Sequence, residues 1–265
     1  MGSGMPGRFQ DKVAVVSGGS RGIGRGIATA FAREGANCVL ASSSAANLAV
    51  AAKAVAAEGP EPLTIAADLR ELSGCEQVLA RVKERFNRCD ILINNAGRTR
   101  AGNFLDLPDE AFVDGFALKY FGAVRLTRLF WPLLKAAQGH VVNIVGGAAR
   151  SPEPEFLVGG SVNAAVANFA KGLSKLGMRD GVNVNVVHPG NTRTERSEEL
   201  LAQRAEAASK PVEELRKAAL ARSGIRRVGE VEDVAALTLF LCTDAARHIQ
   251  GTAIAVDGGA TAGYY

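Results

Sequence analysis

Residues 17–24 read SGGSRGIG and stand between an apolar run, VAVVSG (13–18), and a helical pattern over residues 22–34. Glycines at this spacing let the backbone turn tightly and approach a phosphate group closely. A helix that begins here presents unpaired amide groups and the positive end of its dipole to an anion. The stretch therefore predicts a strand–turn–helix unit that binds the diphosphate of a nucleotide.

The same alternation continues along the whole chain. Short apolar runs predict seven buried strands at 13–18, 37–42, 62–68, 90–97, 140–147, 183–190 and 252–259. Helical patterns lie between them near 22–34, 45–58, 73–87, 109–136, 161–179 and 231–243. Strands that are apolar on both faces and separated by helices form a parallel sheet covered on both sides. We therefore expect an α/β, Rossmann-type doubly wound sheet of about seven strands, with a ligand crevice at the carboxyl ends of the strands.

The chain of 265 residues is predicted to form one domain. Residues 1–8 (MGSGMPGR) are expected to be a disordered or added leader, and residues 9–265 the single domain. The segment 191–227, rich in Arg, Glu and Ala, interrupts the alternation, and we interpret it as a helical lid over the crevice.

Composition excludes several classes of function. The net charge of +4 comes from 31 basic and 27 acidic residues without a block of like charge, which gives nucleic-acid binding little support. No apolar run approaches the roughly 18 residues of a membrane helix, and the start lacks the apolar core of a signal peptide. The four cysteines are isolated from one another and from the three histidines, which predicts no metal site, no disulfide and a cytoplasmic location.

Five motifs then carry a resemblance that runs nearly end to end. They are the glycine turn with Ser17 at its start, Asn94-Asn95-Ala96-Gly97 after the fourth strand, Asp68 after the third, Pro189-Gly190 followed by Thr192 and Thr194, and Val256-Asp257-Gly258-Gly259. In this order and spacing the chain resembles the short-chain dehydrogenase/reductase family. The resemblance implies a nicotinamide dinucleotide cofactor, with Asp68 near the adenine and the Pro-Gly-Thr segment holding the nicotinamide carboxamide.

The resemblance, together with the residues at the glycine turn and at the end of the second strand, implies the following cofactor site. It comprises Gly18, Ser20, Arg21, Gly22, Ile23, Gly24, Ser42, Ser43, Asp68, Leu69, Asn95, Ala96, Gly97, Asn163, Pro189, Gly190, Thr192 and Thr194.

The end of the second strand bears on the choice of dinucleotide. A free ribose 2′-hydroxyl calls for a carboxylate there, but residues 41–44 read ASSS. A 2′-phosphate is bound by positively charged groups and hydroxyl donors, which Arg21 and the serines supply. We therefore expect NADP(H) to be preferred over NAD(H); the alternative is a solvated arginine beside a serine-rich loop.

The residues that carry the family's usual chemistry are replaced. That chemistry uses a tyrosine, a lysine four residues later, a serine on the preceding strand and an asparagine in the long helix before it. Counting along the chain places Gly159, Asn163, Gly146 and Lys119, respectively, at these four positions. Lysine and asparagine have exchanged places, so one ammonium and one amide remain, and we take Lys119 and Asn163 as the candidate catalytic pair.

Neighbouring polar residues are assigned plainer roles. Tyr120 is expected to pack in the core or an interface, and Ser161 to cap a helix that starts after the glycine pair 159–160. Arg150, Glu153 and Glu155 lie in a loop over the crevice, and one of them could contact substrate.

Two hypotheses remain open from the sequence. One is an NADP(H)-linked oxidoreductase with a non-standard proton-transfer site and an unknown small-molecule substrate. The other is a catalytically silent NADP(H)-binding protein that acts as a redox sensor or an oligomer partner. A homo-oligomer, dimer or tetramer, is expected from the helices at 109–136 and 161–179, with Phe130 and Trp131 in a buried seam, and from the tail 259–265.

Overall fold

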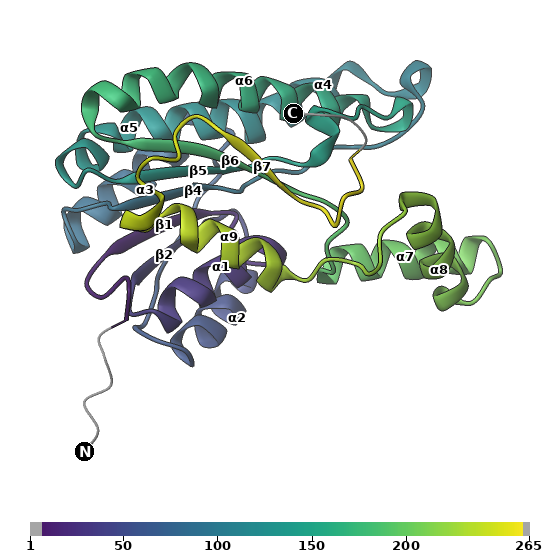
Figure 1. The fold of residues 1–265 in the computed structure, drawn as a ribbon, viewed down its shortest axis with the longest axis horizontal. Helices are drawn as coiled ribbons and strands as arrows, with labels where there is room; N and C mark the ends of the chain where they lie inside the picture. The colour runs from purple at the N-terminus through teal and green to yellow at the C-terminus, as the bar shows by residue number, and fades with distance from the viewer. Residues whose placement is uncertain (1–6, 262–265) are drawn as a thin grey trace.

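The computed structural model describes residues 7–261; residues 1–6, most of the expected leader, and 262–265, the end of the tail, lie outside the described part. Seven parallel strands form one sheet in the order β3-β2-β1-β4-β5-β6-β7 (Figure 1). The strands are β1 Val13–Ser17, β2 Asn37–Ser42, β3 Leu63–Ala66, β4 Ile91–Asn94, β5 His140–Ile144, β6 Asn183–Pro189 and β7 Ala253–Val256. The predicted strands and the Rossmann-type architecture are confirmed.

Helices cover both faces of the sheet. They are α1 Gly22–Arg33, α2 Ala45–Ala56, α3 Leu72–Arg85, α4 Asp109–Gly115, α5 Gly122–Ala136, α6 Leu157–Asp180, α7 Glu195–Ala207, α8 Val212–Ser223 and α9 Val231–Leu241. A π-helical segment, Phe116–Phe121, joins α4 to α5. Short 3₁₀ turns lie at Phe104–Asp106, Gly147–Ala149, Pro154–Phe156 and Asp244–Ala246.

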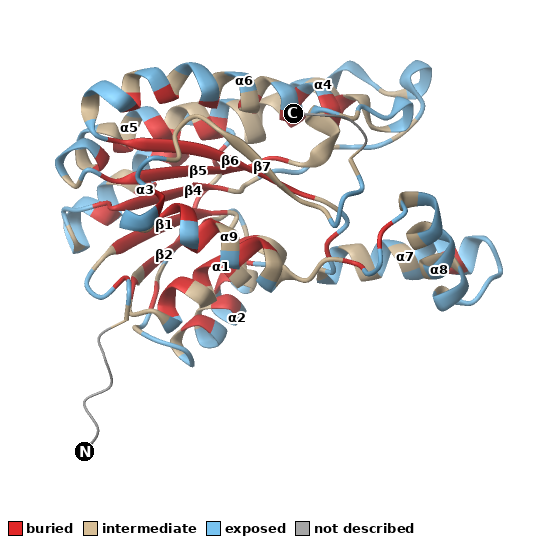
Figure 2. Ribbon diagram, in the orientation of Figure 1, coloured by how far each residue is buried: buried red, intermediate tan, exposed pale blue. Residues whose placement is uncertain are grey.

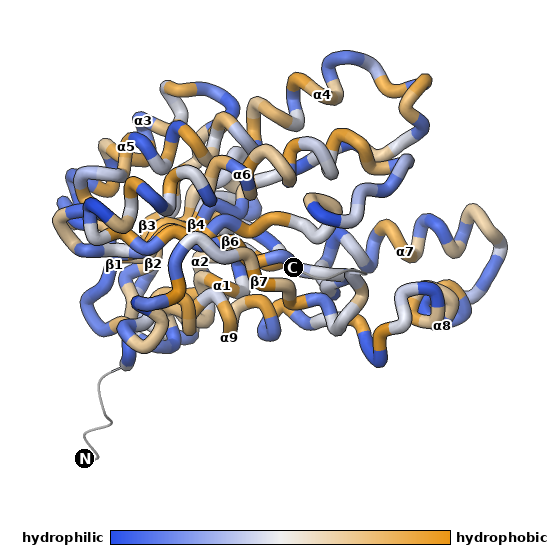
Figure 3. Tube along the Cα trace, turned by 45° about the horizontal axis from the view of Figure 1, so that its top comes forward, coloured by the Kyte–Doolittle hydropathy of each residue, from blue (hydrophilic) through white to orange (hydrophobic). Residues whose placement is uncertain are grey.

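Alternation along the strands builds two hydrophobic cores. Val16 and Leu40 point to the face covered by α1, α2 and α9, whereas Val15 and Val39 point to the face covered by α3, α5 and α6. Burial is almost continuous along the central strands (Figure 2), and hydrophobic positions are frequent along them (Figure 3). Strands buried on both sides read as nearly continuous apolar runs, which explains the apolar stretches in the sequence.

The segment expected to form a lid contains α7 and α8. The two helices project beyond the body of the domain (Figure 1), and α8 buries none of its residues. Two segments, 191–194 leading in and 227–230 leading out, lie side by side at their base, where Thr192 bridges to Gly229.

Two expectations about helices are wrong. Helix α6 begins at Leu157, because the 3₁₀ turn Pro154–Phe156 leads directly into it, so the glycine pair 159–160 lies inside its first turns. Ser161 is therefore an exposed helical residue and caps nothing. Phe130 is fully buried in the core and cannot form an intersubunit seam, whereas Trp131 is half-buried and donates to Asp180 at 2.9 Å.

Within residues 7–261, none of the helices combines the length and the apolarity that a bilayer-spanning segment needs. In the same range no three His, Cys, Asp or Glu side chains are grouped so that they could hold a metal ion.

Candidate functional site

A cavity of about 490 Å³ opens at the carboxyl ends of the strands, around the point between β1 and β4 where the strand order reverses. Most residues of the expected cofactor site line it: Gly18, Ser20, Arg21, Gly22, Ile23, Ser42, Ser43, Asp68, Leu69, Asn95, Ala96, Gly97, Pro189, Gly190 and Thr194. Gly24, Asn163 and Thr192 are not among the residues that line it. The strand order and the motif positions thus bring the predicted residues to one crevice.

The glycine turn is shaped by close backbone approaches. Gly18 has φ +65°, a conformation that L side chains rarely adopt. A Cβ added to Gly24 would lie 2.3 Å from the Gly18 carbonyl oxygen, so α1 packs against the turn too closely for any side chain. These glycines form the cradle that a diphosphate requires at the start of α1.

Ser17 and Asn95 hold the cradle in place. The Ser17 hydroxyl accepts hydrogen bonds from the amides of Asn95 and Ala96 at 3.0 and 3.1 Å. The Asn95 side-chain amide donates to the carbonyls of Ser17 and Gly18 at 3.2 and 3.1 Å. The Asn95 side chain therefore fixes the backbone of the glycine turn.

The end of the cavity where the sequence predicts the adenosine carries hydroxyl groups and a free cation. Ser20 and Ser42 are joined at 2.9 Å between their hydroxyl oxygens, and Ser43 and Arg21 are exposed beside them. In the part of the chain that the structure describes, the Arg21 guanidinium has no hydrogen bond or ion pair. Asp68 is bound by Arg70, with Nη2 2.7 Å from Oδ2, and these hydrogen bonds hold the pKa of the Asp68 carboxyl below its usual range.

Lys119 enters the opposite end of the cavity from the π-helical segment. Its stem runs over Gly97, where an added Cβ would lie 2.9 Å from the Lys119 Cδ. Burial lowers the pKa of Lys119 to about 8, and its ammonium makes no hydrogen bond or ion pair within residues 7–261. A π-helical turn widens the helix locally and is frequent at functional sites, so this segment directs the lysine toward the cavity.

Asn163 packs against Gly146, which lines the cavity. The side chain is 2% exposed, and its Nδ2 is 3.0 Å from the position that a Cβ on Gly146 would take. The amide thus fills space that a side chain at residue 146 would need. Its Oδ1 is buried without a partner among the described residues, so a polar ligand atom or water is needed to satisfy it.

Phe156 is a site residue that the sequence did not reveal. An added Cβ on Gly159 would lie 2.1 Å from both Cε1 and Cζ of the Phe156 ring. The ring therefore occupies the direction in which any side chain at residue 159 would point. The pattern of prolines around residue 156 predicted a loop, and a loop gives no signal for where its aromatic ring packs.

His188 also faces this end of the site, on β6. Its Nδ1 lies 2.6 Å from the Val145 carbonyl oxygen, which places the ring proton on Nδ1. The Nε2 is buried and has no partner in the described chain. Burial lowers the pKa of His188, although the hydrogen bond to Val145 opposes this, so the ring is neutral at physiological pH.

Comparison with known proteins agrees with this geometry. The model of a protein family described as enoyl-(acyl carrier protein) reductase matches residues 18–261. An uncharacterised oxidoreductase of Mycobacterium tuberculosis is 32% identical over 256 residues, which cover 96% of this chain and 94% of that protein.

The chain belongs to the short-chain dehydrogenase/reductase family.

Solved structures of the family superpose closely. The L-sorbose reductase of Gluconobacter frateurii, in complex with NADPH and L-sorbose, has a TM-score of 0.93 and 29% identity, and the match covers 98% of this chain and 100% of that one. An actinorhodin polyketide ketoreductase with NADPH has a TM-score of 0.89 and 27% identity, covering 94% of this chain and 97% of that one. The chain thus has the fold of these NADPH-bound reductases.

Proposed function

We propose that the protein is an NADP(H)-linked oxidoreductase in which Lys119 takes over the role of the family's phenol. The observation that carries this proposal is the unpaired Lys119 ammonium in the wall of the cofactor cavity. It lies at the end of the cavity where Gly146 and the ring over Gly159 leave no hydroxyl donor. The glycine cradle and the α1 amino terminus fit a dinucleotide, because Gly18 and Gly22 line the cavity with bare backbone before and at the first turn of α1.

The proposed mechanism assigns a role to each residue. The dinucleotide, when bound, supplies or takes up a hydride. Lys119 donates a hydrogen bond or a proton to the substrate oxygen on which negative charge develops. Asn163 accepts a hydrogen bond through its unsatisfied Oδ1, from a ribose hydroxyl or from substrate. His188 holds its ring proton on Nδ1, which leaves the lone pair of Nε2 available to accept a hydrogen bond.

NADP(H) is proposed over NAD(H) because of charge. Arg21 is free to meet a 2′-phosphate, and Ser42 and Ser43 offer hydroxyl donors in place of the carboxylate that a free 2′-hydroxyl would need.

One observation favours the alternative, a silent dinucleotide-binding protein. The Phe156 ring fills the direction of the missing phenol, so the usual proton donor cannot be restored there by a small movement. The deciding experiment is a screen for NADPH oxidation over ketones, quinones, imines and enones, with a binding titration alongside. The proposal expects turnover of at least one class; tight binding without turnover of every class would favour the silent protein.

A homo-oligomer and a cytoplasmic location are further proposals. Val113 on α4 and Phe121 before α5 are 60% and 46% exposed and would suit an interface between copies. The four free cysteines are all buried, which suits a reducing compartment.

A further inference from the structure

The first residue of α7 contacts the start of α1. The Glu195 carboxylate accepts a hydrogen bond from the Gly22 amide at 3.2 Å, and its other oxygen pairs with the Arg25 guanidinium. Burial raises the pKa of Glu195, but hydrogen bonds and the charge of Arg25 lower it by a larger amount. The pKa of this carboxyl therefore lies below its usual range. The group is an anion under ordinary conditions.

The amides at the start of α1 are also those that a dinucleotide needs. Gly22 and Ile23 line the cofactor cavity beside Thr194 and Glu195. Glu195 occupies one of the few unpaired N–H groups in the first turn of α1, and a diphosphate bound there would lie close to the carboxylate. Two anions in such contact repel each other.

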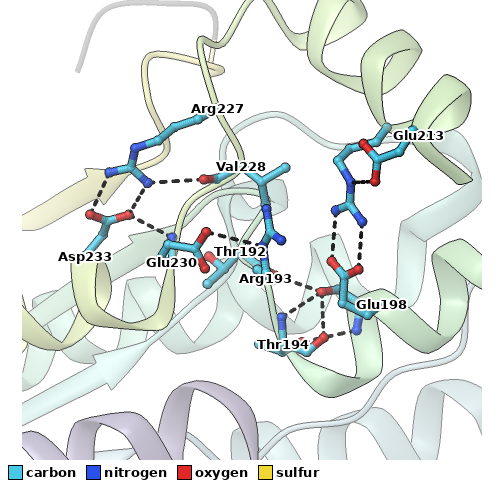
Figure 4. Close-up of polar contacts among 11 residues, drawn as sticks. Thr192, Arg193, Thr194, Glu198, Glu213, Arg227, Val228, Glu230 and Asp233 are labelled. Atoms are coloured by element: carbon cyan, nitrogen blue, oxygen red, sulfur yellow. Dashed lines mark hydrogen bonds and ion pairs between the residues drawn. The ribbon is translucent and has the colours of Figure 1, made fainter.

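Glu195 belongs to the lobe formed by α7 and α8 (residues 195–223), and side-chain contacts hold the two helices of this lobe together. Thr194 caps α7 through a reciprocal pair of hydrogen bonds with Ser197, and Glu198 on α7 binds Arg216 on α8 through both carboxylate oxygens (Figure 4). Movement of Glu195 would therefore carry α7 and α8 with it.

The base of the lobe is clamped separately. Arg193 pairs with Glu230 at 3.2 Å, and Arg227 binds both carboxylate oxygens of Asp233 (Figure 4). The first contact joins the incoming segment to the outgoing one, the second holds the outgoing segment to α9, and neither involves α1. The Glu195 contacts with Gly22 and Arg25 are thus a distinct link between the lobe and α1.

We propose that Glu195 competes with the cofactor's diphosphate for the amides at the start of α1, so that dinucleotide binding displaces this carboxylate and releases α7 from α1. The inference rests on the proposed function only in taking a nicotinamide dinucleotide as the ligand. Glu195 then sets cofactor affinity and couples this affinity to the position of the α7–α8 lobe. No motif of the family's cofactor site assigns this role to Glu195.

Calorimetric titration of Glu195→Gln with NADPH and with NADH tests the competition. Removal of the negative charge should tighten both dinucleotides about tenfold, since a single charge-assisted contact is worth about a factor of ten. Adenosine 2′-monophosphate, which has no diphosphate, should bind unchanged. Glu199→Gln makes the same charge change at an exposed position on the same helix and should leave all three affinities at wild-type values.

A second measurement tests whether the link to α1 restrains the α7–α8 lobe. Arg25→Gln removes the cation of the link without altering α7, and limited trypsin digestion should then cut the α7–α8 segment severalfold faster than in the wild type. Wild-type affinity of Glu195→Gln for both dinucleotides, equal tightening of adenosine 2′-monophosphate, or unchanged digestion would overturn the proposal. Failure of both dinucleotides to bind any variant would overturn the cofactor assignment and this inference together.

Discussion

Arg21 offers the sharpest test of cofactor choice. It stands at the N-cap of α1 with an extended backbone, φ −154° and ψ 166°, so its side chain is free of the helix. The side chain is exposed beside Ser43, and its guanidinium has no competing acid in the described chain. Substitution of Arg21 by alanine therefore removes one positive charge from the proposed 2′-phosphate subsite and breaks no side-chain contact among the described residues.

The expected magnitude follows from that exposure. A hydrogen bond to a charged group contributes about 1.5–3 kcal/mol, and solvent screening places an exposed guanidinium at the lower end of this range. Arg21→Ala should therefore weaken NADPH about tenfold. NADH carries no 2′-phosphate, so its affinity should stay within about twofold of the wild-type value.

Isothermal titration calorimetry of both cofactors against both proteins measures this effect directly, and NADH is the internal control. The wild type should bind NADPH more tightly than NADH. Equal affinities in the wild type, or an equal loss for both cofactors in the variant, would refute the assignment of Arg21 to the 2′-phosphate.

The remaining predictions concern the turn, the aromatic ring, Lys119 and assembly. Gly24→Ala should cost about 1–3 kcal/mol of stability and weaken both dinucleotides, because its Cβ would meet the Gly18 carbonyl; thermal denaturation checks the first effect and titration the second. Gly159→Tyr should be destabilised by a similar amount, about 1–3 kcal/mol, and Phe156→Ala should relieve this, so additive losses in the double variant would contradict the clash. The rate of carbonyl reduction should fall as pH rises through about 8, since the Lys119 ammonium is the acid and loses its proton there; a flat profile from pH 7 to 9 would contradict this role. Light scattering should give a dimer or tetramer at micromolar concentration, and a monomer would exclude the proposed interface.

The sequence predicted the sheet well because the evidence for it is local. Each strand is rich in apolar residues, as in VAVVS of β1, and burial on both faces of the central strands favours this. The glycine turn was predictable for a related reason, since Gly18 and Gly24 meet steric demands that no other residue satisfies.

Contacts set by tertiary packing could not be predicted in the same way. Phe130 and Trp131 are neighbours and so point about 100° apart on α5, which sends one ring to the core and leaves the other at the surface. The Phe156 ring over Gly159 and the orphaned Nε2 of His188 depend on how separate segments meet, and neither leaves a periodic signal. The link from Glu195 to Gly22 spans 173 positions along the chain and is invisible to motif spacing.

The most direct test of the central claim is a single-turnover measurement on Lys119→Met, with NADPH saturating and a substrate found in the screen. Methionine keeps the length of the stem over Gly97 and deletes the charge. We expect hydride transfer, followed as loss of NADPH absorbance, to slow by about 10²–10⁴, with NADPH affinity within about twofold of wild type. Transfer at the wild-type rate would contradict the assignment of Lys119 as the group that replaces the phenol.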